Sequence, residues 1–381
     1  MNLAEIENRA RKAITPLAPA DAEASFFGSR SDAGRSLPPY YLVYFLLVKL
    51  LGFKDLGHFE KIAFSIPVKI EDTVLMVEHR KFGLGIFIKD DADETAAEEV
   101  AKRIRAGVKA AEPYFEALAD AAAKGSALNV ENNARALLER FAYFADRYKQ
   151  KSVEADARKD EQIKTELEAS DGVSRAFTVT FPSHILRREA RWYATAAIEA
   201  FYSWTEHLFI LVAILRGKIK TGEDVANTAG SEWREKFKLA LDIDDPATKQ
   251  FYDRLTALRN QVRNFVAHGA FGKNGQAMQF HSDVGAVPLL MPHRQNKNHF
   301  QFGNGVDFVP PEAMLLIFDF VSHMWAGNLS PAKIYIDAGL PLILSYAFEG
   351  RYAEAMASDE EMEIFTDYVG RMVDDAANMD W

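Results

Sequence analysis

The residues best suited to chemistry lie in the stretch from Leu255 to Gly269, which reads LTALRNQVRNFVAHG. It contains Arg263, Asn264 and His268. A histidine can move a proton near neutral pH, and an arginine can hold a phosphate oxygen through two hydrogen bonds and stabilise charge on phosphorus. An asparagine can hydrogen-bond a neighbouring backbone or the group being cleaved. These side chains together indicate a site for proton transfer at a phosphate.

The helix that carries these residues must direct them into one groove. Apolar side chains at spacings of three and four define its buried stripe, namely Phe251, Leu255, Leu258, Val262, Phe265 and Val266. Arg259 and Arg263, one turn apart, fall outside this stripe. His268 precedes Gly269, where a helix can end and present a side chain. We therefore expect Arg263, Asn264 and His268 to form the site, with Arg259 as a supporting cation.

Three further helices are expected around this one. Residues 187–215 predict a long helix with a wide apolar face and with Glu206 near its middle. Residues 231–241 predict a shorter helix. Asp245 is a suitable N-cap for the helix that carries the site, and residues 312–325 predict a last core helix after two prolines. The pattern is four main helices, with a long insertion before the fourth.

The motif and its setting resemble the HEPN family, in which an Arg-x4–6-His motif has a polar residue after the arginine. The matching string here is RNFVAHG, and the resemblance covers roughly residues 187–330. The resemblance implies an up-and-down four-helix bundle that forms a homodimer, so that two motifs face one composite cleft. Catalytic members of the family cut RNA without a metal and leave a 2′,3′-cyclic phosphate.

Carried over residue by residue, the resemblance implies a role for each motif residue. His268 would help to activate the ribose 2′-hydroxyl, Arg263 would stabilise the transition state, and Asn264 would orient the reacting groups. Glu206 is a weaker match as a supporting residue, because family members differ in which polar residue of the first helix reaches the cleft. A setting in bacterial defence or in a toxin system, with an antitoxin or other protein partner, follows from family analogy alone.

Two other interpretations of the motif stay open. The first is a non-catalytic HEPN module that binds a nucleotide or a protein partner, with the amino-terminal region as the sensing part. The second is a purely structural helical protein, because Arg263 and His268 could simply interact with the last carbonyl groups and the dipole of their helix.

The insertion at residues 270–309 offers a second set of candidates for RNA binding. Arg294 and Lys297 can contact a phosphate backbone, and Phe300 and the nearby Phe302 can stack on bases. The same segment contains His281, His293 and His299 with Asp283, but their spacing matches no metal-ligand pattern. We therefore expect neither a metal nor another cofactor.

Composition and charge narrow the class of protein. The chain has 381 residues, is 48% hydrophobic and has no cysteine, which suits a soluble protein of the reducing cytoplasm. No signal-peptide pattern opens the chain, and the apolar run at residues 40–53 is too short to span a membrane. The net charge of -10 argues against nucleic-acid binding by bulk electrostatics. Residues 187–275, with 14 Lys and Arg against 11 Asp and Glu, are mildly basic by contrast.

The amino-terminal region predicts a small antiparallel sheet. Residues 64–70 and 82–88 alternate apolar and polar side chains, and residues 74–77 lie between them, which predicts a three-stranded meander. Pro67 suggests that its strand lies at an edge of the sheet.

The expected fold class is therefore mainly α with a small antiparallel β-meander, and the chain is expected to have four regions. They are an α+β region (1–92), a helical connector that can project as a coiled-coil arm (93–182), the HEPN-like bundle with its insertion at 270–309 (183–330), and an acidic helical extension (331–381).

Overall fold

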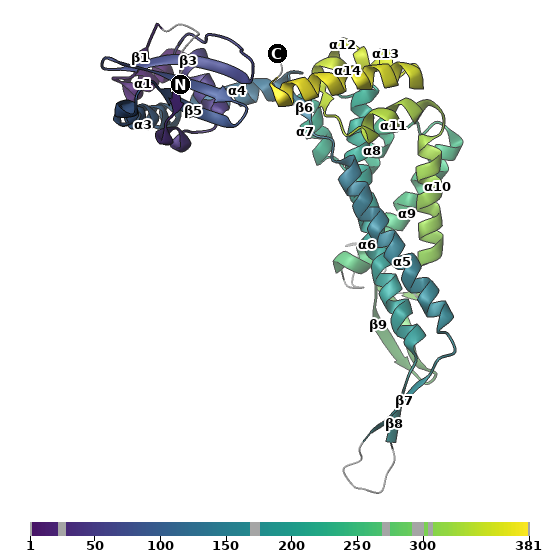
Figure 1. Cartoon of the computed structure of the whole chain (residues 1–381). Coiled ribbons are helices and arrows are strands. Elements are labelled where there is room, and N and C mark those ends of the chain that lie inside the picture. The colour runs from purple at the N-terminus through teal and green to yellow at the C-terminus, as the bar shows by residue number, and fades with distance from the viewer. Residues whose placement is uncertain are drawn as a thin grey trace. The chain divides into compact units, whose positions relative to one another are not determined.

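The computed structural model describes residues 2–21, 28–167, 176–268, 275–291, 301–303 and 308–379. For residues 167, 176, 264–268, 275–277, 290, 291 and 301 it describes the backbone alone. The described chain is mainly helical with small antiparallel sheets, which confirms the expected class at this level (Figure 1). It divides into two compact units, Met1–Ser126 with Asp367–Trp381, and Ala127–Thr366.

This division differs from the four regions expected from the sequence. The second half of the expected connector belongs to the helical unit, because α5 (Ala134–Ala157) packs along α6 (Pro182–Leu215) over much of its length. The carboxyl-terminal extension is shared between the units. Its last part belongs with the sheet, where the Lys61 backbone N–H donates to the carbonyl of Met379 at 3.3 Å.

The expected meander forms the centre of the first unit. The strands β3 (Ile62–Ile70), β4 (Thr73–Arg80) and β5 (Gly83–Ile88) pair antiparallel in succession. Two short strands, β1 (Ala18–Pro19) and β2 (Ser29–Arg30), extend the sheet to the order β1-β3-β4-β5-β2.

The prediction that Pro67 marks an edge strand is wrong. The strand β3 lies between β4 and β1, which pairs with Val68 and Lys69. Proline has no N–H but keeps its carbonyl, and the Pro67 carbonyl accepts a hydrogen bond from the Ala20 backbone N–H at 3.3 Å. A neighbouring strand of two residues therefore requires no donor from the proline.

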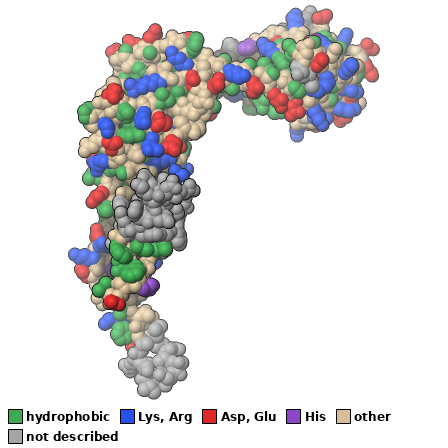
Figure 2. Space-filling model, turned by 180° about the vertical axis from the view of Figure 1, so that it is seen from behind, with side chains coloured by type: hydrophobic (Ala, Val, Ile, Leu, Met, Phe, Trp, Pro, Cys, Tyr) green, Lys and Arg blue, Asp and Glu red, His purple; other side chains and the backbone are tan. Residues whose placement is uncertain are grey.

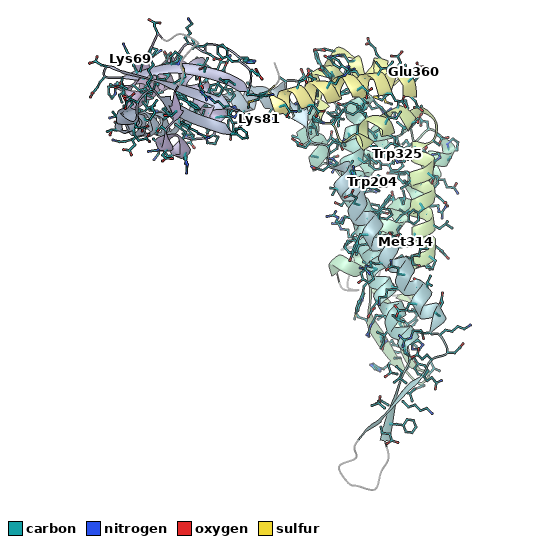
Figure 3. All side chains as sticks on the ribbon, viewed as in Figure 1. Lys69, Lys81, Trp204, Met314, Trp325 and Glu360 are labelled. Atoms are coloured by element: carbon teal, nitrogen blue, oxygen red, sulfur yellow. The ribbon has the colours of Figure 1, made fainter. Side chains whose placement is uncertain are left out.

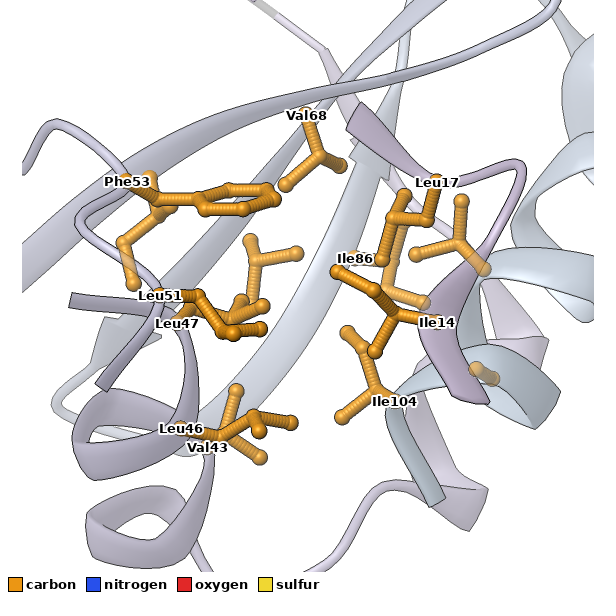
Figure 4. Packing of buried hydrophobic residues seen from close by; sticks show 14 of the residues in the cluster. Ile14, Leu17, Val43, Leu46, Leu47, Leu51, Phe53, Val68, Ile86 and Ile104 are labelled. Carbon is orange, nitrogen blue, oxygen red and sulfur yellow. The ribbon is translucent and has the colours of Figure 1, made fainter. Parts of the chain in front are cut away.

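Helices cover one face of this sheet because alternate residues of its strands are apolar. Val68, Leu75, Val77 and Ile86 are fully buried on that face. Figure 4 shows Ile14, Leu46 and Ile104, from three different helical segments, converging on this core. The helical segments of the unit are α1 (Leu3–Ile14), η1 (Asp32–Ser36), α2 (Tyr40–Tyr44) with a π-helical continuation (Phe45–Leu50), η3 (Asp91–Asp93), α3 (Glu94–Ala110) and α4 (Glu112–Lys124).

The second unit is built on the antiparallel pair α5 and α6, which a β-ribbon connects. The ribbon consists of β7 (Ile163–Leu167) and β8 (Ala176–Thr180). The expected helical connector (93–182) is therefore wrong in its last part, where residues 163–167 and 176–180 are strands. Residues 163–167 alternate in side-chain type, and they pair with β8 instead of extending the helix that ends at Ala157.

The remaining elements of the chain complete the second unit, and α14 continues into the first. They are β6 (Asn129–Val130), α7 (Gly222–Gly230), α8 (Trp233–Ala240), α9 (Pro246–His268), β9 (Gly275–Ser282), β10 (Gly285–Met291), β11 (Gln301–Phe302), α10 (Pro310–Trp325), η4 (Gly327–Leu329), α11 (Ser330–Asp337), β12 (Leu342–Ile343), α12 (Leu344–Glu349), α13 (Arg351–Ala355) and α14 (Asp359–Asn378). The insertion therefore contains an antiparallel sheet of order β11-β10-β9.

The helix α9 begins and ends where the sequence predicts. The Thr248 backbone N–H donates to Asp245 Oδ2 at 2.8 Å, so Asp245 caps the helix, and Pro246 occupies its first turn. The helix ends at His268.

The helix α6 is the central element of the second unit. Phe201 and Phe209 on it are fully buried, the first against Phe320 of α10 and the second against Phe237 of α8. By length and composition α6 alone, among the described helices, could cross a membrane. In this fold, however, 78% of its most apolar window is buried, as in the core helix of a globular unit.

Candidate functional site

One carboxylate in the middle of α6, that of Glu206, contacts both α8 and α9. Arg259 Nη2 donates to Glu206 Oε1 at 2.7 Å, and Lys236 Nζ donates to Glu206 Oε2 at 3.4 Å. The Lys236 side chain is only 5% exposed, whereas those of Glu206 and Arg259 are about one-third exposed. Glu206 therefore compensates one buried and one half-buried cation, which fixes α8 and α9 against α6.

Aromatic rings hold the Arg259 guanidinium in place. Its central carbon lies 5.3 Å from the centre of the Tyr202 ring and 5.8 Å from the centre of the Trp233 ring, which are cation–π distances. The Tyr202 hydroxyl donates to the carbonyl of Leu255 at 2.7 Å. Burial raises the pKa of Tyr202, so the phenol stays a neutral donor. Arg259 is thus a well-ordered structural cation.

A second buried contact positions α8. The Trp233 indole N–H donates to Thr205 Oγ1 at 2.9 Å, and both side chains are almost completely buried. Thr205 Oγ1 in turn donates to the carbonyl of Phe201 one turn earlier in α6, at 2.9 Å. The Thr205 hydroxyl therefore accepts one hydrogen bond and donates another, so the buried Trp233 N–H has an acceptor.

Two adjoining pockets open beside these contacts, and Glu206, Arg259 and Arg263 line both. The first has a volume of about 320 Å³, and its other lining residues are Glu199, Tyr202, Ser203 and Val262. The second has a volume of about 340 Å³, and its other lining residues are Ser231, Glu232, Trp233, Arg234, Thr256 and Asn260. The walls of the second pocket are mainly polar, and its arginines suit an anionic, hydrogen-bonding ligand more than an apolar one.

The two arginines of α9 differ in their charge partners. Arg259 is paired with Glu206, whereas Arg263 is exposed and has no ion pair with another described residue. The pKa of Glu232 lies below its ordinary value, mainly because Arg234 donates a hydrogen bond to it and also because the charges of Arg259 and Arg263 act on it. Arg263 is therefore the cation of this group that is available to an anion in the pockets.

The structure thus brings together Arg263, Arg259 and Glu206 of the sequence-predicted site. Asn264 and His268 follow Arg263 by one and five residues on α9, but their side chains lie outside the described residues.

The candidates in the insertion are only partly described. Arg294, Lys297 and Phe300 lie outside the described residues. Phe302 lies on β11, is 66% exposed and has its ring centre 5.7 Å from that of Phe280 on β9.

Of the candidate metal set, His281 lies on β9 and Asp283 lies in the turn that follows, while His293 and His299 are outside the described residues. No group of three or more His, Asp or Glu side chains in the described part of the chain is arranged to hold a metal.

Two residues that support the site were not predicted. The burial of Lys236 could have been recognised in the sequence, because Lys236 lies three residues after Trp233 and four before Ala240, both on the buried stripe of α8. The sequence contains no comparable indication for Arg140 on α5. Its Nη2 donates to Ser203 Oγ in the wall of the first pocket at 2.7 Å, and this contact depends on the packing of α5 against α6.

No protein-family model, curated protein or solved structure matches the chain. On the face shown in Figure 2, Lys and Arg side chains stand among Asp and Glu side chains, so the charge on that face indicates no particular ligand. What the site can do therefore rests on its own residues. It offers two adjoining pockets lined by Arg263, which has no ion pair with another described residue, near the end of a helix that finishes in a histidine.

Proposed function

We propose that the protein is a metal-independent endoribonuclease of HEPN type. The observation that supports this proposal best is the position of Arg263, which lines two adjoining pockets between α6, α8 and α9 while Arg259 is already paired with Glu206. The RNFVAHG motif supplies the other two groups, Asn264 and His268, on the same turn and a half of helix.

In the proposed reaction His268 takes the proton of a ribose 2′-hydroxyl, and the resulting oxygen attacks the adjacent phosphorus. The bond from phosphorus to the 2′-oxygen forms as the bond to the 5′-oxygen of the next nucleotide breaks, and that oxygen receives a proton. The products are a 2′,3′-cyclic phosphate and a 5′-hydroxyl. Arg263 stabilises the charge on the phosphoryl oxygens, and Asn264 orients the phosphate.

Two copies of the chain are proposed to share one cleft, with α9 from each copy contributing its Arg263 and His268. A two-fold symmetric dimer places the same surface of each copy opposite the other, so one motif meets its equivalent. RNA is the proposed substrate.

The test is cleavage of single-stranded and structured RNA in the presence of EDTA, comparing the wild type with the His268→Ala variant. The proposal requires fragments that end in a 2′,3′-cyclic phosphate from the wild type and none above background from the variant. If both proteins leave RNA uncut, or if the variant cuts as well as the wild type, the proposal is wrong. Nucleotide binding without any cleavage would instead favour the non-catalytic HEPN module.

A further inference from the structure

The β-ribbon of β7 and β8 extends beyond the ends of α5 and α6 (Figure 1). It is a two-stranded sheet, and no third strand of the described chain pairs with either of its edges. Residues 163–166 and 177–180 are all exposed, and Figure 3 shows the side chains of its outer part clear of the other described elements. A two-stranded ribbon alone is marginally stable in water, and the unpaired N–H and C=O groups of an open edge can pair with another strand.

The order of side chains along β7 fits a second copy of the same strand. β7 reads IKTEL, so Lys164 and Glu166 stand on either side of Thr165. When two such strands lie antiparallel about a two-fold axis at Thr165, Lys164 of each copy comes opposite Glu166 of the other. Opposite charges directly across an antiparallel pair stabilise it, whereas like charges destabilise it. The edge is therefore complementary to itself in charge.

Both charges are available for this pairing. Across the ribbon Lys164 faces Val179 and Glu166 faces Phe177, so β8 supplies no counter-charge to either. Lys164 Nζ lies 5.9 Å from the centre of the Phe177 ring, and neither Lys164 nor Glu166 has an ion pair with another described residue. A second copy gives each of these side chains a charge partner that the described part of its own chain does not supply.

The same charges select against other partners. A lysine on an edge strand discourages pairing with an arbitrary strand, because most strands offer no carboxylate at the opposite position. Antiparallel pairing with a second β7 avoids this cost, whereas parallel pairing in register places like charges opposite each other. The strand β8 reads AFTVT and carries no charge, so its edge has no such selectivity.

We propose that two copies of the chain associate through β7 and form a four-stranded antiparallel sheet of order β8-β7-β7-β8. The two-fold axis passes through Thr165, and Lys164 and Glu166 form two equivalent ion pairs across it. This contact is separate from the cleft proposed at α9, because no residue of the ribbon lines the two pockets there. A failure of RNA cleavage therefore leaves this proposal standing, and the reverse also holds.

Disulfide formation through one introduced cysteine tests this contact in the full chain. The chain has no cysteine, so a Thr165→Cys variant can form a protein disulfide only with a second copy. Directly opposite residues of an antiparallel pair have Cα atoms about 4.5–5.5 Å apart, which lies within the range for a disulfide. We expect most of this variant to become a disulfide-linked dimer on mild oxidation in air at micromolar concentration. Absence of the linked dimer would overturn the proposal.

Thr178→Cys is the matched control, because Thr178 is an exposed threonine directly opposite Thr165 within the ribbon. In the proposed sheet its two copies are three strand spacings apart, about 14 Å, which is too far for a disulfide. We expect at least about tenfold less linked dimer from this variant than from Thr165→Cys. Equal linkage would place the contact at the edge of β8 or attribute it to random collision, and either result refutes the proposal.

Charge reversal then tests the register. In the Thr165→Cys background, Lys164→Glu places carboxylates opposite each other, and Glu166→Lys places ammonium groups opposite each other. Each is expected to reduce linkage about fivefold or more, and mixing the two variants, tagged to differ in size, is expected to restore it between unlike chains. Lys149→Glu makes the same change in net charge at an exposed position on α5 and is expected to leave linkage unchanged. Linkage that neither reversal reduces, or that the mixture does not restore, contradicts the proposed pairing.

Discussion

Arg259 Nη2 lies 2.7 Å from Glu206 Oε1, so the arginine one turn before the RNFVAHG motif is neutralised within its own chain. Arg263 has no such partner among the described residues. Two arginines on one face of α9 therefore have different roles. Arg259 fixes the helices around the pockets, and Arg263 is available to an anionic ligand.

The first prediction separates these roles by activity. Arg263→Ala is expected to lower the rate of RNA cleavage by about 100-fold or more, because a charge-stabilising group typically contributes that much. It is expected to leave thermal stability nearly unchanged, since Arg263 is exposed. Arg254→Ala is the control, because Arg254 is also an exposed arginine of α9 but lines neither pocket. Equal loss of activity in both variants contradicts the assignment.

The second prediction concerns the charge at the centre of the site. Glu206→Gln leaves the buried ammonium of Lys236 without a counter-charge, so we expect it to lower the free energy of unfolding by about 1–3 kcal/mol. Glu139→Gln removes a carboxylate from an exposed ion pair and is expected to cost less than about 0.5 kcal/mol. Urea unfolding of both variants provides the comparison. A Glu206→Gln variant as stable as the wild type shows that Lys236 needs no charge partner.

Much of the fold could be predicted because local patterns determine it. The period of two in residues 64–88 predicted the meander, and the Asp245-Pro246 signal and Gly269 predicted both ends of α9. The pairing of α5 with α6 could not be predicted, since it depends on which distant helix covers the apolar face of α5. The boundary of the first unit coincides with Gly125-Ser126, which interrupts the helical pattern, but such an interruption does not by itself indicate that a compact unit ends there.

For the candidate site too, the sequence predicted the residues but not the contacts that depend on tertiary packing. Residue type and spacing selected Glu206, Arg259 and Arg263, and the structure places all three around the same two pockets. Their pairing could not be predicted, because either arginine of α9 can reach a carboxylate on the facing helix. The hydrogen bond from Arg140 to Ser203 depends entirely on tertiary packing.

The third prediction tests the contact that positions α8. Thr205→Val keeps the shape of the side chain but leaves the buried Trp233 N–H without an acceptor, so it is expected to lower the free energy of unfolding by about 1–3 kcal/mol. Thr195 on the same helix also donates to a carbonyl one turn earlier, at 3.0 Å, but it is only half-buried. Thr195→Val is therefore expected to change stability by less than about 0.5 kcal/mol. If chemical denaturation shows the same loss of unfolding free energy in both variants, the Trp233–Thr205 hydrogen bond contributes no more than a half-buried threonine contact.

The fourth prediction is a dependence of stability on pH. Burial lowers the pKa of His207 from its ordinary value of 6.5, and its Nε2 accepts a hydrogen bond from the Asn133 backbone N–H at 3.0 Å. As the pH falls below 6.5, the unfolded chain therefore takes up this proton before the folded chain does, and the folded state loses stability.

Denaturant titrations at several pH values measure this effect. The contribution of one such histidine is at most about 1.4 kcal/mol per pH unit, and His207→Gln is expected to make the decline shallower below pH 6.5. His184→Gln, at an exposed position in the first turn of α6, is expected to leave the decline as in the wild type. An unchanged decline in His207→Gln would assign the pH dependence to other groups.

The claim that two copies share one active site is tested most directly by mixing. The wild type is co-expressed with a differently tagged Arg263→Ala/His268→Ala chain, and RNA cleavage in EDTA is measured at a fixed total chain concentration as the fraction of inactive chain rises. A composite cleft predicts that total activity falls with the square of the wild-type fraction, to about one-quarter in an equal mixture. A linear fall to about one-half would mean that each chain cuts RNA alone, which contradicts the shared site.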